Sequence, residues 1–128
     1  GPNETNPHLI PEIQKQVLEG KRVIKLGNLT PKRDFIHTYD MAAAVETLLT
    51  HVEGGIHTYN LGRGIEYSVT EIVDAFSKAI NEKIEIEVDQ SRVRKVERQH
   101  LLADVSKLKS LGWTPKIGIE EGIKTLVQ

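Results

Sequence analysis

A helix-start motif followed by an alternating strand pattern, within residues 68–88, constrains the fold of this chain more than any other feature. Ser68 and Glu71 have the spacing of a capping box, in which the hydroxyl and the carboxylate each satisfy a helix N–H group. The residues that follow keep the period of a buried helix face: Val69, Ile72, Val73, Phe76 and Ile80. Residues 84–88 then alternate between apolar and acidic, as a half-buried strand does. A helix and a strand this close together predict a mixed α/β domain.

Signals of the same kind predict the other elements. Residues 1–7 are rich in Pro, Asn and Gly and predict a loop, as does the polar stretch at 89–100. A helix is predicted from Ile10 through Val17, with Pro11 in its first turn and Gly20 as its stop. Further helices are predicted at residues 41–52, from Asp104 to near Gly112 and at 119–127, and strands at 22–26, 34–38 and 58–61. The sequence therefore predicts one small mixed α/β domain over residues 1–128, with short strands and four or five helices.

Composition argues against several classes of function. Lys and Arg number 17 against 18 Asp and Glu, so the formal net charge is −1, whereas nucleic-acid binding normally needs a strongly basic face. The chain has no cysteine, which excludes a disulfide or a thiolate site. It has no apolar run near the roughly 20 residues that span a bilayer, and no signal peptide. We therefore expect a cytoplasmic protein that binds neither nucleic acid nor membranes.

The motifs of cofactor binding and catalysis are missing from the sequence. It has no glycine-rich dinucleotide fingerprint, so we expect no Rossmann domain in this chain. Its five histidines lack the spacing of a helical zinc site. No tyrosine has a lysine four residues later. We therefore predict no catalytic, cofactor-binding or metal-ligating residues. Because the chain begins at Gly1-Pro2-Asn3 without a methionine, we also expect a piece of a larger protein.

Several segments, in the same order along the chain, resemble one enzyme family. They are Asn6-Pro7-His8-Leu9-Ile10-Pro11, Gly27 to His37 with Arg33-Asp34-Phe35-Ile36-His37 as its sharpest part, Tyr59-Asn60-Leu61-Gly62, Arg94-Lys95-Val96-Glu97 and Leu111-Gly112-Trp113-Thr114-Pro115. Together they resemble the extended short-chain dehydrogenase/reductase family, the NAD-dependent nucleotide-sugar epimerases and dehydratases, in its C-terminal substrate-binding domain. Lys95 departs from the family pattern, because proline is common there.

The resemblance implies a division of labour between two domains. The parent enzyme would bind NAD or NADP in an N-terminal Rossmann domain and oxidise the sugar at C4 through a tyrosine of that domain. It would then epimerise, eliminate water or reduce. The present chain would grip a nucleoside diphosphate sugar and position it, and alone it would be inactive. The base, the sugar and the final reaction are not fixed by these motifs.

Chemistry and resemblance point to the same candidate substrate-binding residues. A diphosphate is bound by guanidinium groups, for which Arg33 and Arg94 are candidates. A ribose diol needs an acceptor, and Glu97 offers a carboxylate three residues after Arg94. The alternative for each is an ordinary surface charge: Arg33 could pair with Asp34, and Arg94 and Glu97 could be solvated loop residues.

A nucleotide base needs an apolar slot with a few polar contacts at its edge. Leu9, Ile10 and Phe35 are the candidates for its walls, and Asn60 for an edge contact. The alternative is that the three apolar residues belong to the core and that Asn60 holds a turn.

Two other functions and one surface property remain to be weighed. The chain could be a stand-alone nucleotide-sugar binding or regulatory module. Nucleic-acid binding through residues 92–98 is disfavoured, because this stretch contains Glu97 and no aromatic residue. If a Rossmann domain is missing, an apolar patch should be exposed on the first loop and helix and on the segment after Arg33. Native dimerisation is not expected, because the family usually dimerises through the other domain.

Overall fold

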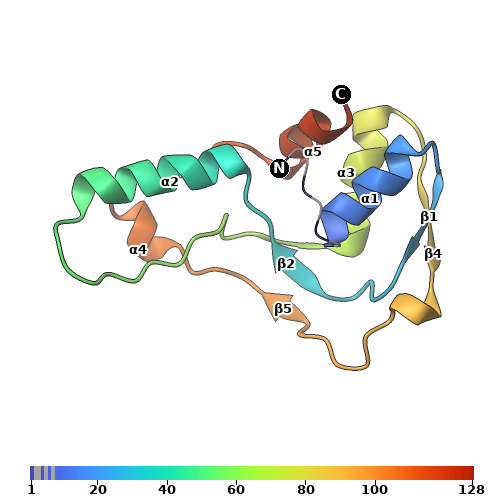
Figure 1. Ribbon diagram of the computed structural model, residues 1–128, viewed down its shortest axis with the longest axis horizontal. Coiled ribbons are helices and arrows are strands. Elements are labelled where there is room, and N and C mark those ends of the chain that lie inside the picture. The colour runs from blue at the N-terminus through green and yellow to red at the C-terminus, as the bar shows by residue number, and fades with distance from the viewer. Residues whose placement is uncertain (2–3, 5, 7) are drawn as a thin grey trace.

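The computed structural model describes residues 1, 4, 6 and 8–128. Pro2, Asn3, Thr5 and Pro7 lie outside these residues, and with them most of the predicted first loop. The main body packs three helices, α1 (Leu9–Leu18), α3 (Val69–Ile80) and α5 (Ile119–Val127), beside a parallel pair of strands, β1 (Val23–Leu26) and β4 (Glu85–Val88) (Figure 1). Their apolar faces form one core, in which Ile13, Ile24, Ile72, Phe76 and Ile123 are almost fully buried.

The start of α3 confirms the predicted capping box. The backbone N–H and the hydroxyl of Ser68 donate to the Glu71 carboxylate, and the Glu71 N–H donates back to the hydroxyl. These bonds stabilise the ionised carboxylate and hold the pKa of Glu71 below its ordinary value. At the other end, Asn81 adopts a left-handed conformation (φ 53°) and terminates the helix.

A second sheet brings distant parts of the chain together around one short strand. β2 (Lys32–Asp34) lies between β3 (Glu66–Ser68), which is antiparallel to it, and β5 (His100–Leu101), which is parallel. The register sets Arg33 opposite Tyr67 on one side and Leu101 on the other. Arg33 therefore occupies the middle of the central strand.

The rest of the molecule is an arm that extends from this sheet (Figure 1). It consists of α2 (Thr38–His51), α4 (Ser106–Lys109) and the extended chain between α2 and β3. A second, smaller core holds the arm together and contains Ala44, Val105, Leu108 and Trp113.

Asp40 joins the arm to the C-terminal segment. Its buried carboxylate accepts hydrogen bonds from the backbone N–H groups of Lys116 and Ile117, at 2.9 Å each. The Trp113 indole N–H donates to the Asp40 carbonyl oxygen at 3.1 Å. One residue therefore fixes the path of the chain from α4 to α5.

Two predicted strands are wrong. The strand at Asp34 comprises residues 32–34 rather than 34–38, because the His37 ring accepts a hydrogen bond from the Tyr39 N–H and caps α2. As a result α2 begins at Thr38, ahead of Met41. Residues 58–61 are extended but form no strand within the described chain, because no neighbouring backbone pairs with them. The other predicted helices and strands are confirmed, with shifted ends.

None of the helices among the described residues has both the length and the hydrophobicity that crossing a membrane requires.

We expect Asp40→Ala to lower the free energy of unfolding by about 2–3 kcal/mol, because two backbone N–H groups lose a charged acceptor. Urea denaturation measures this loss. Asp74→Ala is the matched control, because Asp74 is exposed on α3 and its removal should change stability by no more than about 0.5 kcal/mol. An equal loss in both variants would contradict the role given to Asp40.

Candidate functional site

A cleft of about 400 Å³ lies where the two sheets, the start of α1 and the loop between β4 and β5 meet. Five of the seven predicted substrate-binding residues line it: Leu9, Arg33, Phe35, Arg94 and Glu97. Ile10 and Asn60 lie elsewhere. The volume falls within the range of about 300–1,000 Å³ that small-molecule sites occupy.

The charged side of the cleft is built around Glu97. The Glu97 Oε1 atom accepts a hydrogen bond from Arg33 Nη2 at 2.5 Å, and its Oε2 atom lies 3.7 Å from Arg94 Nη1. The side chains of Arg33 and Glu97 are 25% and 15% exposed, whereas that of Arg94 is 74% exposed. The two arginines therefore differ: Arg33 is fixed by an ion pair, and Arg94 projects into solvent beside the cleft.

Asp34 and Arg33 have different partners. Successive side chains of a strand point to opposite faces. The Asp34 carboxylate accepts hydrogen bonds from the backbone N–H groups of Arg63 (2.7 Å), Gly64 (2.8 Å) and Ala103 (3.3 Å). Arg33 donates to Glu97 instead. The Arg-Asp dipeptide is therefore not a surface ion pair: its aspartate holds the fold and its arginine faces the cleft.

Arg92 also lines the cleft, although it is not among the predicted substrate-binding residues. Its guanidinium donates to Glu12 of α1 at 2.7 Å and to Asp89 at 3.3 Å, and these ion pairs raise the pKa of Arg92. The ion pairs tie the β4–β5 loop to α1. The sequence carries no local signal for this contact, because Glu12 and Arg92 are 80 residues apart.

Gly27 allows the β4–β5 loop to cross the end of β1. A Cβ atom at this position would lie 2.2 Å from the Arg92 carbonyl oxygen and 2.7 Å from the carbonyl carbon. Both atoms belong to the backbone, so neither can move aside alone. The sequence marks Gly27 as the end of a strand, but only the fold shows that a second segment passes against it.

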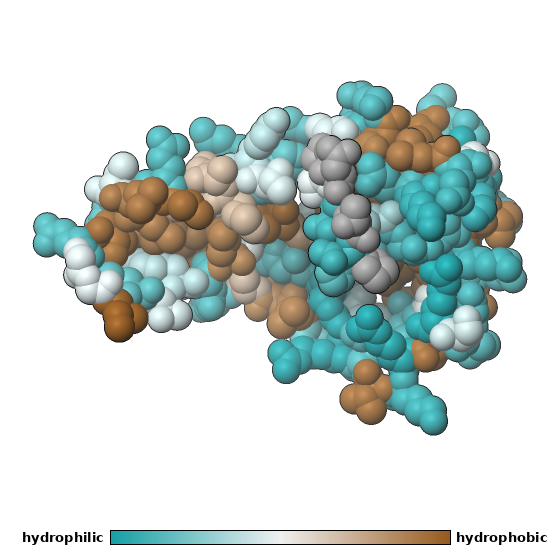
Figure 2. Space-filling model, in the orientation of Figure 1, coloured by the Kyte–Doolittle hydropathy of each residue, from teal (hydrophilic) through white to brown (hydrophobic). Residues whose placement is uncertain are grey.

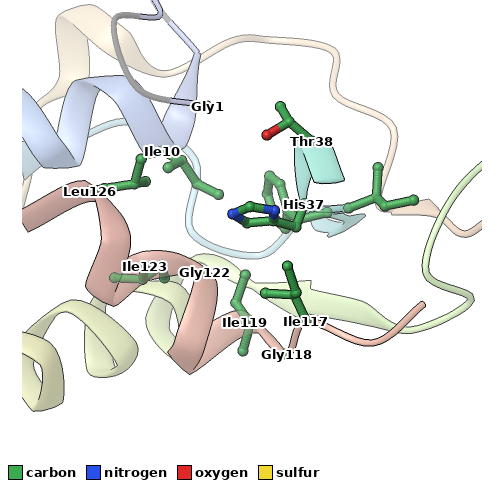
Figure 3. Close-up of a pocket in the computed structure, with 12 residues that line it drawn as sticks. Gly1, Ile10, His37, Thr38, Ile117, Gly118, Ile119, Gly122, Ile123 and Leu126 are labelled. Carbon is green, nitrogen blue, oxygen red and sulfur yellow. The ribbon is translucent and has the colours of Figure 1, made fainter. Parts of the chain in front are cut away.

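Ile10 lines a different pocket, which is small and apolar. Figure 3 shows Ile10, Ile119 and Leu126 around the His37 ring, between the starts of α1 and α2 and helix α5. Its volume is about 80 Å³, and one water molecule takes up about 30 Å³ of liquid. This pocket is too small for a nucleotide.

Asn60 lines a separate hollow of about 330 Å³, with Asp34, Leu61 and residues 101–103. Its side-chain amide donates to the Asp104 carbonyl oxygen at 3.2 Å, which holds the extended chain against the segment before α4. The part of the chain that the structure describes contains no group of three or more metal-binding side chains.

Comparison with known proteins gives the cleft its context. The sequence model of the family described as GDP-mannose 4,6 dehydratase matches residues 1–126. The chain belongs to this family. Its members fall within the extended short-chain dehydrogenase/reductase enzymes that act as NAD-dependent nucleotide-sugar epimerases and dehydratases, and the chain corresponds to their C-terminal part.

Relatives within this family carry several activities. GDP-L-fucose synthase 1 of Arabidopsis thaliana is 31% identical over 132 residues, which covers 96% of this chain and 40% of the relative. The UDP-glucose 4-epimerase of Bifidobacterium longum, in complex with NAD+ and UDP, superposes with a TM-score of 0.83 at 26% identity, over 98% of this chain and 39% of that one. The dTDP-glucose 4,6-dehydratase of Bacillus anthracis, in complex with NAD, has a TM-score of 0.83 and 26% identity over 100% and 40%.

The chain spans about two fifths of the length of these family members. The fold predicted from the resemblance is confirmed, including five α-helices among the described residues.

We expect Gly27→Ala to lower the free energy of unfolding by about 1–3 kcal/mol, the usual effect of forcing a methyl group into filled space. Thermal unfolding measures the loss. Gly54→Ala is the control, because no atom lies within 4 Å of a Cβ built there and the backbone tolerates it. If Gly27→Ala were as stable as Gly54→Ala, the loop would not cross β1 as closely as described.

Proposed function

We propose that this chain is the substrate-binding part of an NAD- or NADP-dependent nucleotide-sugar epimerase, dehydratase or reductase. The cleft would hold the nucleoside diphosphate and position the sugar for oxidation by a catalytic domain. The observation that carries the proposal is that Arg33, Arg94 and Glu97 meet on one cleft, although Arg33 and Glu97 are 64 residues apart in sequence. The relative solved with NAD+ and UDP supports the same ligand class.

In this proposal, Arg94 is the main hydrogen-bond donor to the diphosphate. Its exposed guanidinium can make two parallel N–H bonds to phosphate oxygens. Arg92 is a weaker candidate, because Glu12 and Asp89 already neutralise its charge. Arg33 offsets the negative charge of Glu97, which would otherwise repel a diphosphate at the same site.

Glu97 is the acceptor for the ribose diol. The ion pair with Arg33 occupies the Oε1 atom of Glu97 and keeps the carboxylate fixed, while the Oε2 atom lies 3.7 Å from Arg94 Nη1. A carboxylate has about four lone-pair sites, so further hydrogen bonds remain possible. A rigid acceptor loses less entropy on binding than a mobile one.

The base would rest on the apolar side of the cleft. Leu9 and Phe35 are half-buried and line it, together with Tyr67 and Val69. Ile10 and Asn60 lie outside the cleft, so the proposal gives them no part in base recognition. The chain alone would bind but not react, because the catalytic tyrosine and the cofactor belong to the other domain.

We expect calorimetric titration with UDP, GDP, dTDP and CDP to reveal binding of one nucleotide. Arg94→Ala should weaken that binding by tenfold or more, because a charge-assisted bidentate contact is lost, at about 1.4 kcal/mol per tenfold. Arg98→Ala is the matched control, because Arg98 is exposed in the same loop and lies outside the cleft lining. Equal weakening in both variants would mean that only the net charge of the loop matters, and not the position of Arg94. If the wild-type chain bound none of the four nucleotides, this would count against the proposed function.

The proposed catalytic domain needs a surface to dock on, and α2 offers one. At about 100° per residue, six apolar side chains of α2 cover an arc of about 160° that contains no charged residue: Met41, Ala42, Ala44, Val45, Leu48 and Leu49. Ala44 and Leu48, at one edge of the arc, pack on the small core. Met41, Val45 and Leu49 are exposed, Leu49 at 79%, and Figure 2 shows the apolar surface over this helix.

The extended chain next to α2 continues this surface. Ile56 is fully exposed, and Tyr59 and Leu61 turn toward the small core. An extended segment with an unpaired backbone can add to the edge of another sheet. We therefore assign α2 and residues 56–61 to the interface with the α/β domain that the relatives hold in the remaining three fifths of their length. The first helix has a smaller part than the sequence predicts, because Ile13 and Val17 face the core.

A double substitution of the exposed side chains tests this surface. Val45→Glu with Leu49→Lys should lower the binding of a fluorescent apolar dye and any self-association of the chain by at least half, without lowering thermal stability. Leu18→Lys is the control, because Leu18 is 62% exposed on α1, away from the arm. If dye binding is unchanged by the double substitution, the α2 surface is not an exposed docking face.

A further inference from the structure

The backbone of Arg94 is held by a side chain from the segment that follows β1. The Asn28 amide accepts a hydrogen bond from the Arg94 N–H at 2.7 Å and donates one to the Arg94 carbonyl oxygen at 3.1 Å. Asn28 lies two residues after the end of β1 and 66 residues before Arg94, and both line the cleft. A single amide therefore satisfies both backbone groups of one residue, as a neighbouring strand would.

The β4–β5 loop has other fixed points, but they lie at its two ends. At the start, the Asp89 N–H donates to the Leu26 carbonyl oxygen, and Arg92 is paired with Glu12. At the end, the Lys32 N–H donates to the Gln99 carbonyl oxygen at 2.7 Å. Within the described chain, the Asn28 amide alone hydrogen-bonds the backbone of residues 94–96 from outside the loop.

The side chain of Arg94 cannot fix its own position. It is 74% exposed, and its nearest ionic partner is Glu97 at 3.7 Å, which is too long for a hydrogen bond. A long, exposed arginine loses rotamer freedom when it binds. If the Arg94 backbone were also mobile, the conformational entropy lost on binding would be larger. The place from which this guanidinium reaches the cleft therefore depends on the backbone, and hence on Asn28.

We propose that Asn28 is a positioning residue for diphosphate recognition, which acts by holding the Arg94 backbone over the cleft. This inference rests on the proposed function, since it assigns Arg94 to the diphosphate. Asn28 itself need not touch the ligand. Its contribution is preorganisation: the loop is ordered before the ligand arrives, so less affinity is lost in ordering it.

A double-mutant cycle tests whether Asn28 acts through Arg94. The nucleotide that binds the wild-type chain, among UDP, GDP, dTDP and CDP, is titrated into Asn28→Ala, Arg94→Ala and the double variant. We expect Asn28→Ala to weaken binding by about fivefold to tenfold, and by no more than Arg94→Ala does. In the Arg94→Ala background, Asn28→Ala should have no further effect. A merely structural role would weaken binding equally in both backgrounds and would overturn the inference.

Amide hydrogen exchange gives a second readout that needs no ligand. The Arg94 N–H should exchange at least fivefold faster in Asn28→Ala, while amides of the α3 core keep their wild-type rates. Gln14→Ala is the matched control, because the Gln14 amide also bonds a distant carbonyl, that of Leu126, at 2.8 Å, but outside the cleft. It should leave both exchange at Arg94 and nucleotide affinity unchanged.

The two readouts separate failure of this inference from failure of the proposed function. Unchanged amide exchange at Arg94 in Asn28→Ala would show that Asn28 does not hold the Arg94 backbone, even if the wild-type chain binds a nucleotide. Faster amide exchange in Asn28→Ala, without nucleotide binding by the wild-type chain, would confirm that Asn28 holds the Arg94 backbone. It would overturn the role of this contact in recognition, together with the proposed function.

Discussion

The Asp34 carboxylate is the contact on which the arrangement of the cleft depends. It accepts backbone hydrogen bonds from Arg63, Gly64 and Ala103, and so joins the central strand to segments that lie 29 to 69 residues further along the chain. A Cβ atom on Gly62 would lie 2.6 Å from the same carboxylate, so the backbone there can approach only because this residue is glycine. Since neighbouring strand residues face opposite ways, anchoring Asp34 also sets the Arg33 side chain on the other face of β2, where it pairs with Glu97.

Local sequence patterns were sufficient for the helices but not for the strands. The capping box at Ser68 and the period behind it define α3 without help from the rest of the chain. Strands form only where a partner strand lies alongside, and the local sequence does not show which segment that will be. Residues 58–61 have strand composition and remain unpaired, whereas residues 32–34 pair with a strand on both sides. The resemblance located Arg33, Arg94 and Glu97, and the fold brings them together. Asn28 and Arg92 went unrecognised, because their contacts span 66 and 80 residues and leave no periodic trace.

The cleft combines a fixed acceptor with a donor that is held only through its backbone. Glu97 is half-buried and paired, so its position changes little whether or not a ligand is present. Arg94 is exposed, so its guanidinium stays hydrated in the free chain and carries no large desolvation penalty before an anion binds. If the proposed function holds, such a site would keep the ribose in one place while the arginine adjusts to different diphosphate geometries. That property would suit a family whose relatives act on GDP-, UDP- and dTDP-linked sugars.

The two ends of the molecule differ in how completely they bury their apolar surface. Around α3 the helices and strands enclose a continuous core, in which Ile72 and Phe76 have no exposed surface. The arm buries one edge of α2 and leaves the rest uncovered, with Leu49 and Ile56 in solvent. An apolar stripe of about 100° or more is usual for a helix that packs on one core, and the uncovered part of the wider α2 arc would suit the second neighbour that the proposed function requires. The cleft lies where the two sheets meet, and its lining includes no residue of α2 or of residues 56–61. We therefore expect nucleotide recognition to be a property of the body, and docking of a catalytic domain to be a property of the arm.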